Sequence, residues 1–397
     1  MDLPSTARRL VGAVDADRLR DLTMELVRIP SWPGEERAVA ERYAAMLEQA
    51  GLTVSWDTSC PESPSVIGTW NASESGPILQ LDGHTDTVPV EHPPPRVENG
   101  VLYGRGAADM KCGLAAIAEV CRILMASGLP LRGRLLVTAH GQHEKPAPGR
   151  RLHEPLLRLF EKGIKGDVCI IPEGPEHELA IAGKGLFIWE ITFSRDGEPV
   201  HEVRAAGNIP NPVMAAHRFV SLLSERARTW TLTDAYVGPE YFFVGEFRGG
   251  NLYNSIPTSC YVQGVRRYPF GRTFEQARVD FDEVAAQITQ ETRLNVDLHI
   301  MKSGQPYTLS EDEPVVRAVR WGYQMVNGRE MPLAGLRLSG DVSQFNNDGR
   351  IPAVYCGLDG DRGHATPEYA RLDEIVRGTK GLLLACLHYL TAGARAG

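Results

Sequence analysis

The chain has 397 residues, of which 43% are hydrophobic, and a formal net charge of -8 at pH 7. This length suits two or three domains, and the hydrophobic content is ordinary for a globular protein with a sizeable core. The negative charge and the lack of a lysine or arginine cluster argue against a nucleic-acid partner. No apolar run is long enough to cross a bilayer, and the N-terminal segment lacks a signal-peptide pattern, so we expect a cytoplasmic protein without a membrane partner.

Seven cysteines are spread widely along the chain, an odd number with no C-x-x-C pair. Such spacing fits neither a disulfide scaffold nor a zinc ribbon. Most lie in apolar stretches, where a reduced cysteine behaves as a small hydrophobic residue. We therefore expect them to be reduced core residues.

Residues 1–182 alternate helical and strand patterns, which predicts an α/β sheet covered by helices. Amphipathic helices are expected at 16–29, 35–51 and 113–128, and strands at 78–84, 133–141 and 168–174. Each strand has His, Asp or Glu near its carboxyl edge, which is where open α/β sheets place their ligands.

Residues 183–301 change to a β-α-β-β-α-β-like order, which predicts a small, separately folded α+β insertion. The α/β pattern then resumes in residues 302–397, with helices at 313–326 and 372–390 and a strand at 352–358. The expected architecture is thus one α/β domain in two parts, 1–182 and 302–397, interrupted by a second domain.

The segment LQLDGHTDTV, residues 79–88, ends an apolar run with His84 and Asp86. Side chains two apart on a strand project to the same face, so these two residues can touch. A metal-bound imidazole usually gives its other N–H to a carboxylate, which fixes the ring for binding. The alternative is a polar strand end in a surface turn.

Further donors follow the other apolar segments. Asp109 lies in a glycine-rich turn before a helix, where it also suits an N-cap. His143 and Glu144 follow the next strand, Glu173 follows the one after, and His364 lies in a loop near the C-terminus. Imidazole and carboxylate donors at five such positions match the needs of a pair of zinc-like ions.

Several motifs together resemble the M20 metallopeptidases, the group of aminoacylases, carboxypeptidases, deacetylases and dipeptidases. They are LDGHTDTVP, GRGAADMKCGLAA, the HE and PEG that follow two strands, KGLFIWEITFSRDGEPVHEV, GGNLYNSIP, GVRRYP, SGDVSQF and GHATPEY. The resemblance runs in order along nearly the whole chain. It implies a catalytic domain like that of other zinc exopeptidases, interrupted by a lid domain through which the protein forms a homodimer or a higher homo-oligomer.

The resemblance also implies a ligand for each metal position. His84 and Glu173 resemble the ligands of one ion, Glu144 and His364 those of the other, and Asp109 resembles the bridging carboxylate. The expected cofactors are one or two divalent ions per subunit, Zn, Mn or Co.

Four more residues carry implied roles. Asp86 resembles the carboxylate partner of His84. His201 resembles a histidine that reaches the neighbouring subunit's site to stabilise the oxyanion, Asn254 a second polar contact there, and Arg266 an arginine that binds a substrate carboxylate. The alternatives are a surface histidine, a turn asparagine and a surface arginine.

The general-base position departs from the family pattern. Two adjacent glutamates are usual there, the first being the base, whereas this chain has His143 and Glu144. Three accounts remain open. His143 serves as the base, or Glu144 leaves the metal to become the base while His143 binds metal, or hydrolysis has been lost and the protein only binds a small molecule.

The expected function is metal-dependent hydrolysis of a C–N bond in a small molecule, an amide or N-acyl amino acid, through metal-activated water. One alternative is hydrolytic deamination of an aryl amine, as in the M20 relative 5-nitroanthranilate aminohydrolase, with Trp189, Tyr253 or Tyr268 stacking on the ring. The other is a catalytically lapsed binding protein of the same fold.

Overall fold

The computed structural model describes residues 2–205, 209–336, 340–358 and 362–392. The chain divides into two compact units: unit 1, residues 1–181, 309–334 and 340–397, and unit 2, residues 182–308 and 335–339. The sequence placed the inserted domain at 183–301. Unit 2 extends further because its last long strand, β16, continues to Gly304.

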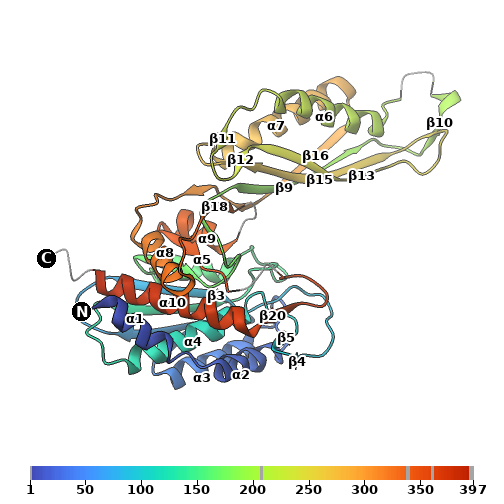
Figure 1. The fold of residues 1–397 in the computed structure, drawn as a ribbon. Helices are drawn as coiled ribbons and strands as arrows, with labels where there is room; N and C mark the ends of the chain where they lie inside the picture. The colour runs from blue at the N-terminus through green and yellow to red at the C-terminus, as the bar shows by residue number, and fades with distance from the viewer. Residues whose placement is uncertain (1, 206–208, 337–339, 359–361, 393–397) are drawn as a thin grey trace. The chain divides into compact units, whose positions relative to one another are not determined.

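A six-stranded sheet forms the centre of unit 1, with helices around it (Figure 1). Its strand order is β1-β2-β6-β3-β7-β19. Strands β6, β3, β7 and β19 are parallel, and β1 and β2 join them as an antiparallel edge. The strands are β1 (Thr53–Asp57), β2 (Ser65–Asn71), β3 (Ile78–His84), β6 (Arg134–His140), β7 (Val168–Ile171) and β19 (Ala353–Tyr355).

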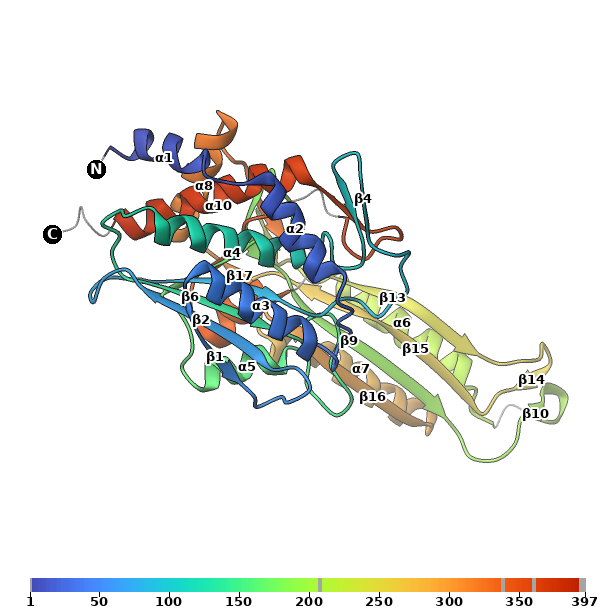
Figure 2. The ribbon, with the colours of Figure 1, turned by 90° about the horizontal axis from the view of Figure 1, so that it is seen from below.

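One face of this sheet packs against helices in a single large hydrophobic core. Leu79 and Leu81 of β3 point into it, as does Val137 of β6. Figure 2 shows α2, α4 and α10 side by side over this face. The helices of this core are α1 (Leu3–Val11), α2 (Ala16–Val27), α3 (Arg37–Ala50), α4 (Lys111–Ala126), α8 (Pro314–Asn327) and α10 (Leu372–Ala392).

The opposite face of the same strands is polar near their carboxyl ends. Because side chains alternate along a strand, Asp82 and His84 of β3 project away from the leucine side. In the parallel register Asp82 lies opposite Thr138, and His84 lies opposite His140. The elements next to this face are α5 (Glu154–Glu161), α9 (Asp341–Gln344) and the π-helical turn η2 (Phe345–Gly349). The register thus lines up buried polar groups on one side of the sheet.

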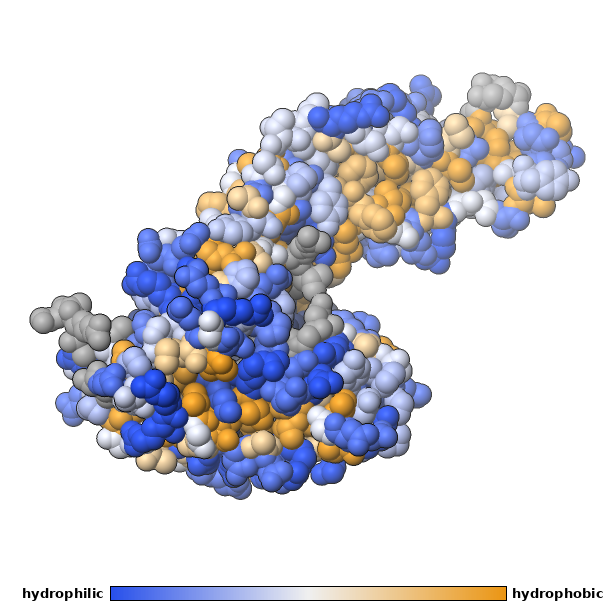
Figure 3. Space-filling view, in the orientation of Figure 1, coloured by the Kyte–Doolittle hydropathy of each residue, from blue (hydrophilic) through white to orange (hydrophobic). Residues whose placement is uncertain are grey.

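Unit 2 is a four-stranded antiparallel sheet, in the order β13-β15-β9-β16, with α6 and α7 on one face. Its own aromatic core includes Trp189, Phe219 and Phe281. Figure 3 shows apolar surface gathered on unit 2 away from its helices. The main elements are β9 (Gly185–Ser194), α6 (Pro212–Ala227), β13 (Tyr241–Gly249), β15 (Ser259–Tyr268), α7 (Phe274–Thr292) and β16 (Asn295–Gly304).

Short elements complete the two units. Unit 1 has a small sheet of β4 (Arg96–Glu98), β5 (Val101–Tyr103) and β20 (Tyr369–Arg371). Unit 2 has β10 (Val200–His201), η1 (Glu202–Arg204), β11 (Thr233–Asp234), β12 (Gly238–Pro239) and β14 (Ser255–Ile256). At the segments where the chain passes between the units lie β8 (Leu179–Gly183), β17 (Tyr307–Thr308) and β18 (Leu333–Leu336).

The predicted α/β class and most long elements are confirmed. α3 ends at Ala50 and is capped by Gly51, whose φ of 104° requires the freedom of glycine. The elements that the sequence did not predict include α1, α5, β1 and β2. All seven cysteines are buried as thiols and not joined in disulfides, as expected. Among the described residues, every helix is too short or too polar to span a bilayer.

Candidate metal centre

His84 is the last residue of β3, and its side chain is completely buried. Its Nε2 lies 2.9 Å from Asp109 Oδ1. Its Nδ1 lies 3.0 Å from the backbone carbonyl oxygen of Asp86. That second bond fixes the ring, so that Nε2 is the nitrogen presented to Asp109.

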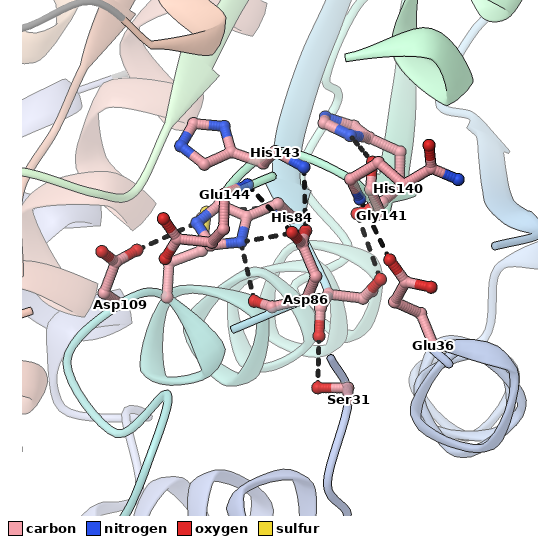
Figure 4. Close-up of polar contacts among 12 residues, drawn as sticks. Ser31, Glu36, His84, Asp86, Asp109, His140, Gly141, His143 and Glu144 are labelled. Atoms are coloured by element: carbon pink, nitrogen blue, oxygen red, sulfur yellow. Dashed lines mark hydrogen bonds and ion pairs between the residues drawn. The ribbon is translucent and has the colours of Figure 1, made fainter. Parts of the chain in front are cut away.

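Asp86 differs from the sequence expectation. Its carboxylate lies 3.6 Å from His84 Nδ1, and the hydrogen-bond contact of the ring goes to the Asp86 carbonyl instead. The strand ends at His84, so the period-two geometry does not extend to Asp86. The carboxylate instead accepts the backbone N–H groups of His143, at 3.1 Å, and Glu144, at 2.9 Å. Asp86 therefore holds the loop that carries these two residues (Figure 4).

The same loop has a second buried support. β6 ends at His140, and Gln142 then adopts a positive φ of 60°. The backbone N–H of Gln142 donates to Glu36 Oε1 at 3.1 Å, and the Ser63 hydroxyl donates to Glu36 Oε2 at 2.6 Å. Burial raises the pKa of Glu36 to about 7. Glu36, which the sequence analysis missed, is thus a buried anchor for the turn.

Asp109 lies in the turn before α4, but the N-cap residue of that helix is Met110, so the N-cap interpretation is wrong. The backbone N–H groups of Ala108 and Asp109 donate to Glu368 Oε1 at 3.0 and 3.1 Å. Arg105 pairs with the other oxygen of Glu368 at 2.9 Å. Glu368, a residue of the GHATPEY motif, therefore shapes the Asp109 turn.

His364 joins Asp109 to Glu144. Its Nε2 lies 2.9 Å from Glu144 Oε2 and 3.3 Å from Asp109 Oδ2. Hydrogen bonds to Asp109 and Glu144 raise the pKa of His364 to about 10. Burial raises the pKa of Asp109, but hydrogen bonds with His364 and His84 outweigh it and hold that pKa well below its usual range.

Glu173 completes the set from the segment after β7. Its Oε2 is buried without a hydrogen-bond partner among the described residues. Burial and the charge of Asp109 raise the pKa of Glu173 to about 8. Ligand atoms of His84, His143 and Glu173 lie within 4.8 Å of one another, as do those of His84, Asp109 and Glu144.

These side chains fit divalent metal ions. The group offers two imidazoles and three carboxylates, the ligand types that zinc and similar ions take in catalytic sites. A buried carboxylate oxygen without a partner is costly unless a cation satisfies it, and Glu173 has such an oxygen. The structure thus brings together all five predicted ligands: His84, Asp109, Glu144, Glu173 and His364.

His143 sits beside this group and has a close carboxylate partner that the sequence analysis did not identify. Its ring stacks on His84 with centroids 4.1 Å apart and an interplanar angle of 4°. Its Nδ1 lies 2.7 Å from Asp341 Oδ2. Burial lowers the pKa of His143, but the Asp341 charge outweighs burial and raises that pKa to about 9. Asp341 belongs to the SGDVSQF motif, the one signal that pointed to it.

His201 and Asn254 lie together in unit 2, on the paired strand ends β10 and β14. Asn254 Nδ2 lies 2.9 Å from His201 Nε2, and His201 Nδ1 lies 2.8 Å from Glu202 Oε2. The His201 side chain is 47% exposed. The sequence expected these residues to act together, and within unit 2 they are neighbours.

Arg266 is completely buried in unit 2, unlike a surface arginine. Its Nη2 lies 2.6 Å from Glu240 Oε2, and its guanidinium carbon is 3.3 Å from the centroid of the Trp230 ring. These contacts are those of a structural ion pair stacked on an aromatic ring. The predicted contact of Arg266 with a substrate carboxylate stays a prediction.

The aromatic residues suggested for ring stacking do not form a cluster. Trp189 and Tyr268 are buried in the core of unit 2, and Tyr253 is 95% exposed. Their positions give no support to an aryl-amine site.

Comparison with known families gives a match over most of the chain. Residues 80–388 match the model of peptidase family M20/M25/M40. The succinyl-diaminopimelate desuccinylase of Halorhodospira halophila is 29% identical over 309 residues, which cover 73% of this chain and 77% of the relative.

Solved structures share the fold. The aminopeptidase PepT of Bacillus cereus has a TM-score of 0.78 at 18% identity, covering 96% of this chain and 100% of that one. The YXEP protein of Bacillus subtilis, described as a dinuclear metal-binding peptidase of family M20, has a TM-score of 0.68 at 14% identity, covering 94% of this chain and 98% of that one.

Proposed function

This chain belongs to peptidase family M20/M25/M40 and is a metallohydrolase acting on carbon–nitrogen bonds, and we propose that it cleaves a small amide of the N-acyl amino acid type. The observation that carries the proposal is the meeting of five imidazole and carboxylate donors at one end of the unit 1 sheet. The names of the curated relatives support the substrate class, since they describe removal of a succinyl group from succinyl-diaminopimelate.

The contacts suggest which residues would hold each ion. His84 and Glu173 would hold one, Glu144 and His364 the other, and Asp109 lies between them. Divalent ions such as Zn²⁺, Mn²⁺ or Co²⁺ polarise a carbonyl and make water a better nucleophile at neutral pH.

His143 is the proposed general base. Glu144 is already engaged by His364, which speaks against Glu144 leaving the metal group to act as base. His143 takes a proton from the attacking water and gives it to the amine nitrogen as the C–N bond breaks. Burial lowers the pKa of His143, but the charge of Asp341 raises it to about 9, and cations at His84 and Glu173 would oppose that rise.

His201 and Asn254 are the proposed stabilisers of the oxyanion. Asn254 Nδ2 lies 2.9 Å from His201 Nε2 within unit 2 and donates to it, and a carboxamide and an imidazole can each donate an N–H to a substrate oxygen. Donors placed where negative charge develops lower the barrier more than they strengthen substrate binding. Their side chains are exposed enough to meet a substrate or a second subunit.

We expect a homodimer formed through unit 2, with His201 acting in the partner's site. Strand β13 lies at the edge of its sheet and exposes Tyr241, Phe243 and Phe247. An exposed apolar edge strand is prone to pair with another chain. If His201 acts in trans, mixing inactive His84→Ala and His201→Ala chains and allowing subunit exchange restores about a quarter of wild-type activity. No restoration in a mixed dimer contradicts the arrangement.

The expected location is the cytoplasm. All seven cysteines are buried thiols that are not joined in disulfides, which suits a reducing compartment.

The proposal is tested by metal reconstitution. The chain is stripped of metal, reloaded with Zn²⁺, Mn²⁺ or Co²⁺, and assayed for amine release from a panel of N-acyl amino acids. We expect at least one ion to restore hydrolysis of at least one acyl amino acid. Absence of hydrolysis with every ion across the panel contradicts the proposed substrate class.

The role of His143 is tested separately with His143→Ala. If His143 is the base, its loss lowers kcat by about 10²- to 10⁴-fold and leaves the metal content unchanged. If His143 is instead a metal ligand beside His84 and Glu173, its loss lowers the number of ions per chain. The matched control is His299→Ala, because His299 is exposed and contacts only Asp297 among the contacts that the structure gives it. His143→Glu adds a check: a gain from an inactive parent would favour the lapsed binding protein.

A further inference from the structure

Four buried side chains, which we call the rear cluster, lie next to His143 and include its partner Asp341. Its members are Asp82, two residues before the end of β3, His140 at the end of β6, His153 before α5, and Asp341 at the start of α9. Their exposed fractions are 0%, 0%, 5% and 0%. Hydrolysis as proposed above uses none of them, so the cost of burying two carboxylates here calls for another explanation.

Asp341 is the centre of the rear cluster. Its Oδ2 lies 2.7 Å from His143 Nδ1 and 3.4 Å from His140 Nε2, and its Oδ1 lies 2.9 Å from His153 Nδ1. Three imidazoles from three different segments therefore surround one carboxylate. A carboxylate with neighbours on both oxygens cannot rotate away from His143 without losing another contact.

The far side of the rear cluster is also held. His140 Nε2 lies 3.3 Å from Asp82 Oδ2, and the Thr138 hydroxyl donates to Asp82 Oδ1. Gln80 Nε2 in turn donates to Thr138 Oγ1 at 2.7 Å. Asp341 therefore rests on a chain of buried polar groups that reaches back along β3 and β6.

Three contacts besides Asp341 constrain His143. His84 stacks on it in parallel, His153 meets it edge-on at a centroid distance of 5.3 Å, and its backbone N–H is held by Asp86. With a carboxylate on Nδ1, the proton of the neutral imidazole belongs on Nδ1 and the lone pair on Nε2. A ring nitrogen of His143 also lies within 4.8 Å of the ligand atoms of His84 and Glu173.

We propose that Asp341 is a positioning residue that holds His143 as the Nδ1–H tautomer, with Nε2 free to accept a proton on the side of His84 and Glu173. His153 Nδ1 lies 2.9 Å from the second oxygen of Asp341, and neither of these two buried atoms has a hydrogen-bond partner among the described residues. The inference rests on the proposed function of His143 as base. It also explains how a histidine can replace the glutamate that the family has at this position. A carboxylate, that of Asp341, still takes part, but it acts on the proton through His143.

The test compares Asp341→Asn with the wild-type chain, both loaded with the metal that supports hydrolysis, on an N-acyl amino acid that the wild type cleaves. Asparagine keeps the size of the side chain but presents an amide, which does not fix the tautomer. We expect kcat to fall on the order of 10³- to 10⁴-fold, as is typical when the carboxylate of a histidine base is replaced by an amide. KM and the number of ions per chain stay within twofold. An unchanged kcat overturns the proposal.

Two comparisons separate positioning from a merely structural role. In a His143→Glu background there is no Nδ1 to hold, so Asp341→Asn changes kcat by less than about threefold if it acts through His143. An equal loss in both backgrounds overturns the proposal. Asp57→Asn is the matched control, since Asp57 is also a buried carboxylate but contacts Lys162 and Ser59 and no member of the rear cluster. If it lowers kcat as much as Asp341→Asn, the positioning role is overturned.

A direct measurement covers the case in which Asp341→Asn does not fold. The ¹⁵N shifts of His143 in the wild-type metal-loaded chain, assigned by comparison with His143→Gln, report which ring nitrogen carries the proton. Nδ1–H is expected, and Nε2–H overturns the proposal. If His143→Ala keeps the wild-type kcat, the proposed base fails and this inference fails with it. If His143→Ala lowers kcat while Asp341→Asn does not, the inference alone fails.

Discussion

Two histidines of this chain, His143 in unit 1 and His201 in unit 2, have proposed roles in the same reaction but very different surroundings. His143 is 11% exposed, stacks on His84 and has a buried carboxylate on Nδ1. His201 is 47% exposed, and its partners, Asn254 and Glu202, lie near the surface. The ring of His143 is fixed by buried contacts, whereas the ring of His201 lies at an exposed strand end.

The difference fits the two tasks. A base must keep one tautomer and one orientation through many turnovers, which buried partners enforce. A residue that meets its substrate from a separate unit needs its donor at the surface. We therefore expect that removing a side chain with buried partners alters the site or the fold. Removing one with exposed partners is expected to alter the reaction alone.

The largest effect is expected from His84→Ala, which removes a buried ligand and the ring on which His143 stacks. We expect fewer ions per chain and a loss in kcat/KM of at least about 10³-fold, the upper range for a single electrostatic stabiliser. Metal analysis and steady-state kinetics measure the two effects. Full metal content with normal kcat/KM would show that the five donors do not form the site.

The next largest effect is expected from Arg266→Ala, which leaves the buried carboxylate of Glu240 with Arg272 as its remaining partner. Removal of one partner of a buried ion pair costs about 3–5 kcal/mol, and Arg272 favours the lower end. The measurement is urea unfolding of unit 2, followed by tryptophan fluorescence.

The matched control for that variant is Arg248→Ala. Arg248 is 70% exposed and pairs with Glu246 on the surface, so its removal costs at most about 1 kcal/mol. If Arg266→Ala instead raises KM and leaves unfolding unchanged, Arg266 contacts the substrate, as the sequence resemblance implied.

A smaller effect is expected from His201→Ala. Loss of one oxyanion donor lowers kcat by about 10²- to 10³-fold. Metal content and the free energy of unfolding stay unchanged, because the side chain is exposed. His217→Ala, an exposed histidine on α6, is the control. Loss of stability in His201→Ala would mean that its surface contacts matter to the fold.

The smallest effect is expected from the titration of Glu36. Burial raises the pKa of its carboxyl group from 4.5 to about 7, so the folded state binds more protons than the unfolded state between these values. The free energy of unfolding therefore falls as pH rises from about 4.5 through 7, by on the order of 2–3 kcal/mol. Glu36→Gln removes this pH dependence, and Glu48→Gln, at an exposed position, keeps it. Parallel pH profiles in wild type and Glu36→Gln would refute the assignment.

The donors themselves could be predicted from the sequence because of where they stand. β3 was expected at 78–84 and has those bounds, so His84 falls at its carboxyl end. Glu173 follows a short apolar run in the same way. The hydrophobic pattern locates the ends of buried strands, and parallel strands bring those ends to one edge.

The supports of the site could not be predicted in the same way. Asp341 begins the four-residue helix α9 and His153 lies in a turn with a positive φ of 56°, and neither segment has a periodic pattern. Asp86 was expected to hold His84 through its carboxylate, but the strand ends first and its carbonyl takes that place. Such contacts depend on how turns close in three dimensions, which residue spacing does not encode.

β7 and β19 pair in parallel, although all residues of unit 2 lie between them in the sequence. This separation has a consequence for biosynthesis. His143 and Asp341 are 198 positions apart, and Glu144 and His364 are 220 apart. Contacts this distant form only after the intervening chain has been made. A polypeptide truncated before Asp341 would lack Asp341 and His364, so the site can be completed only late in translation.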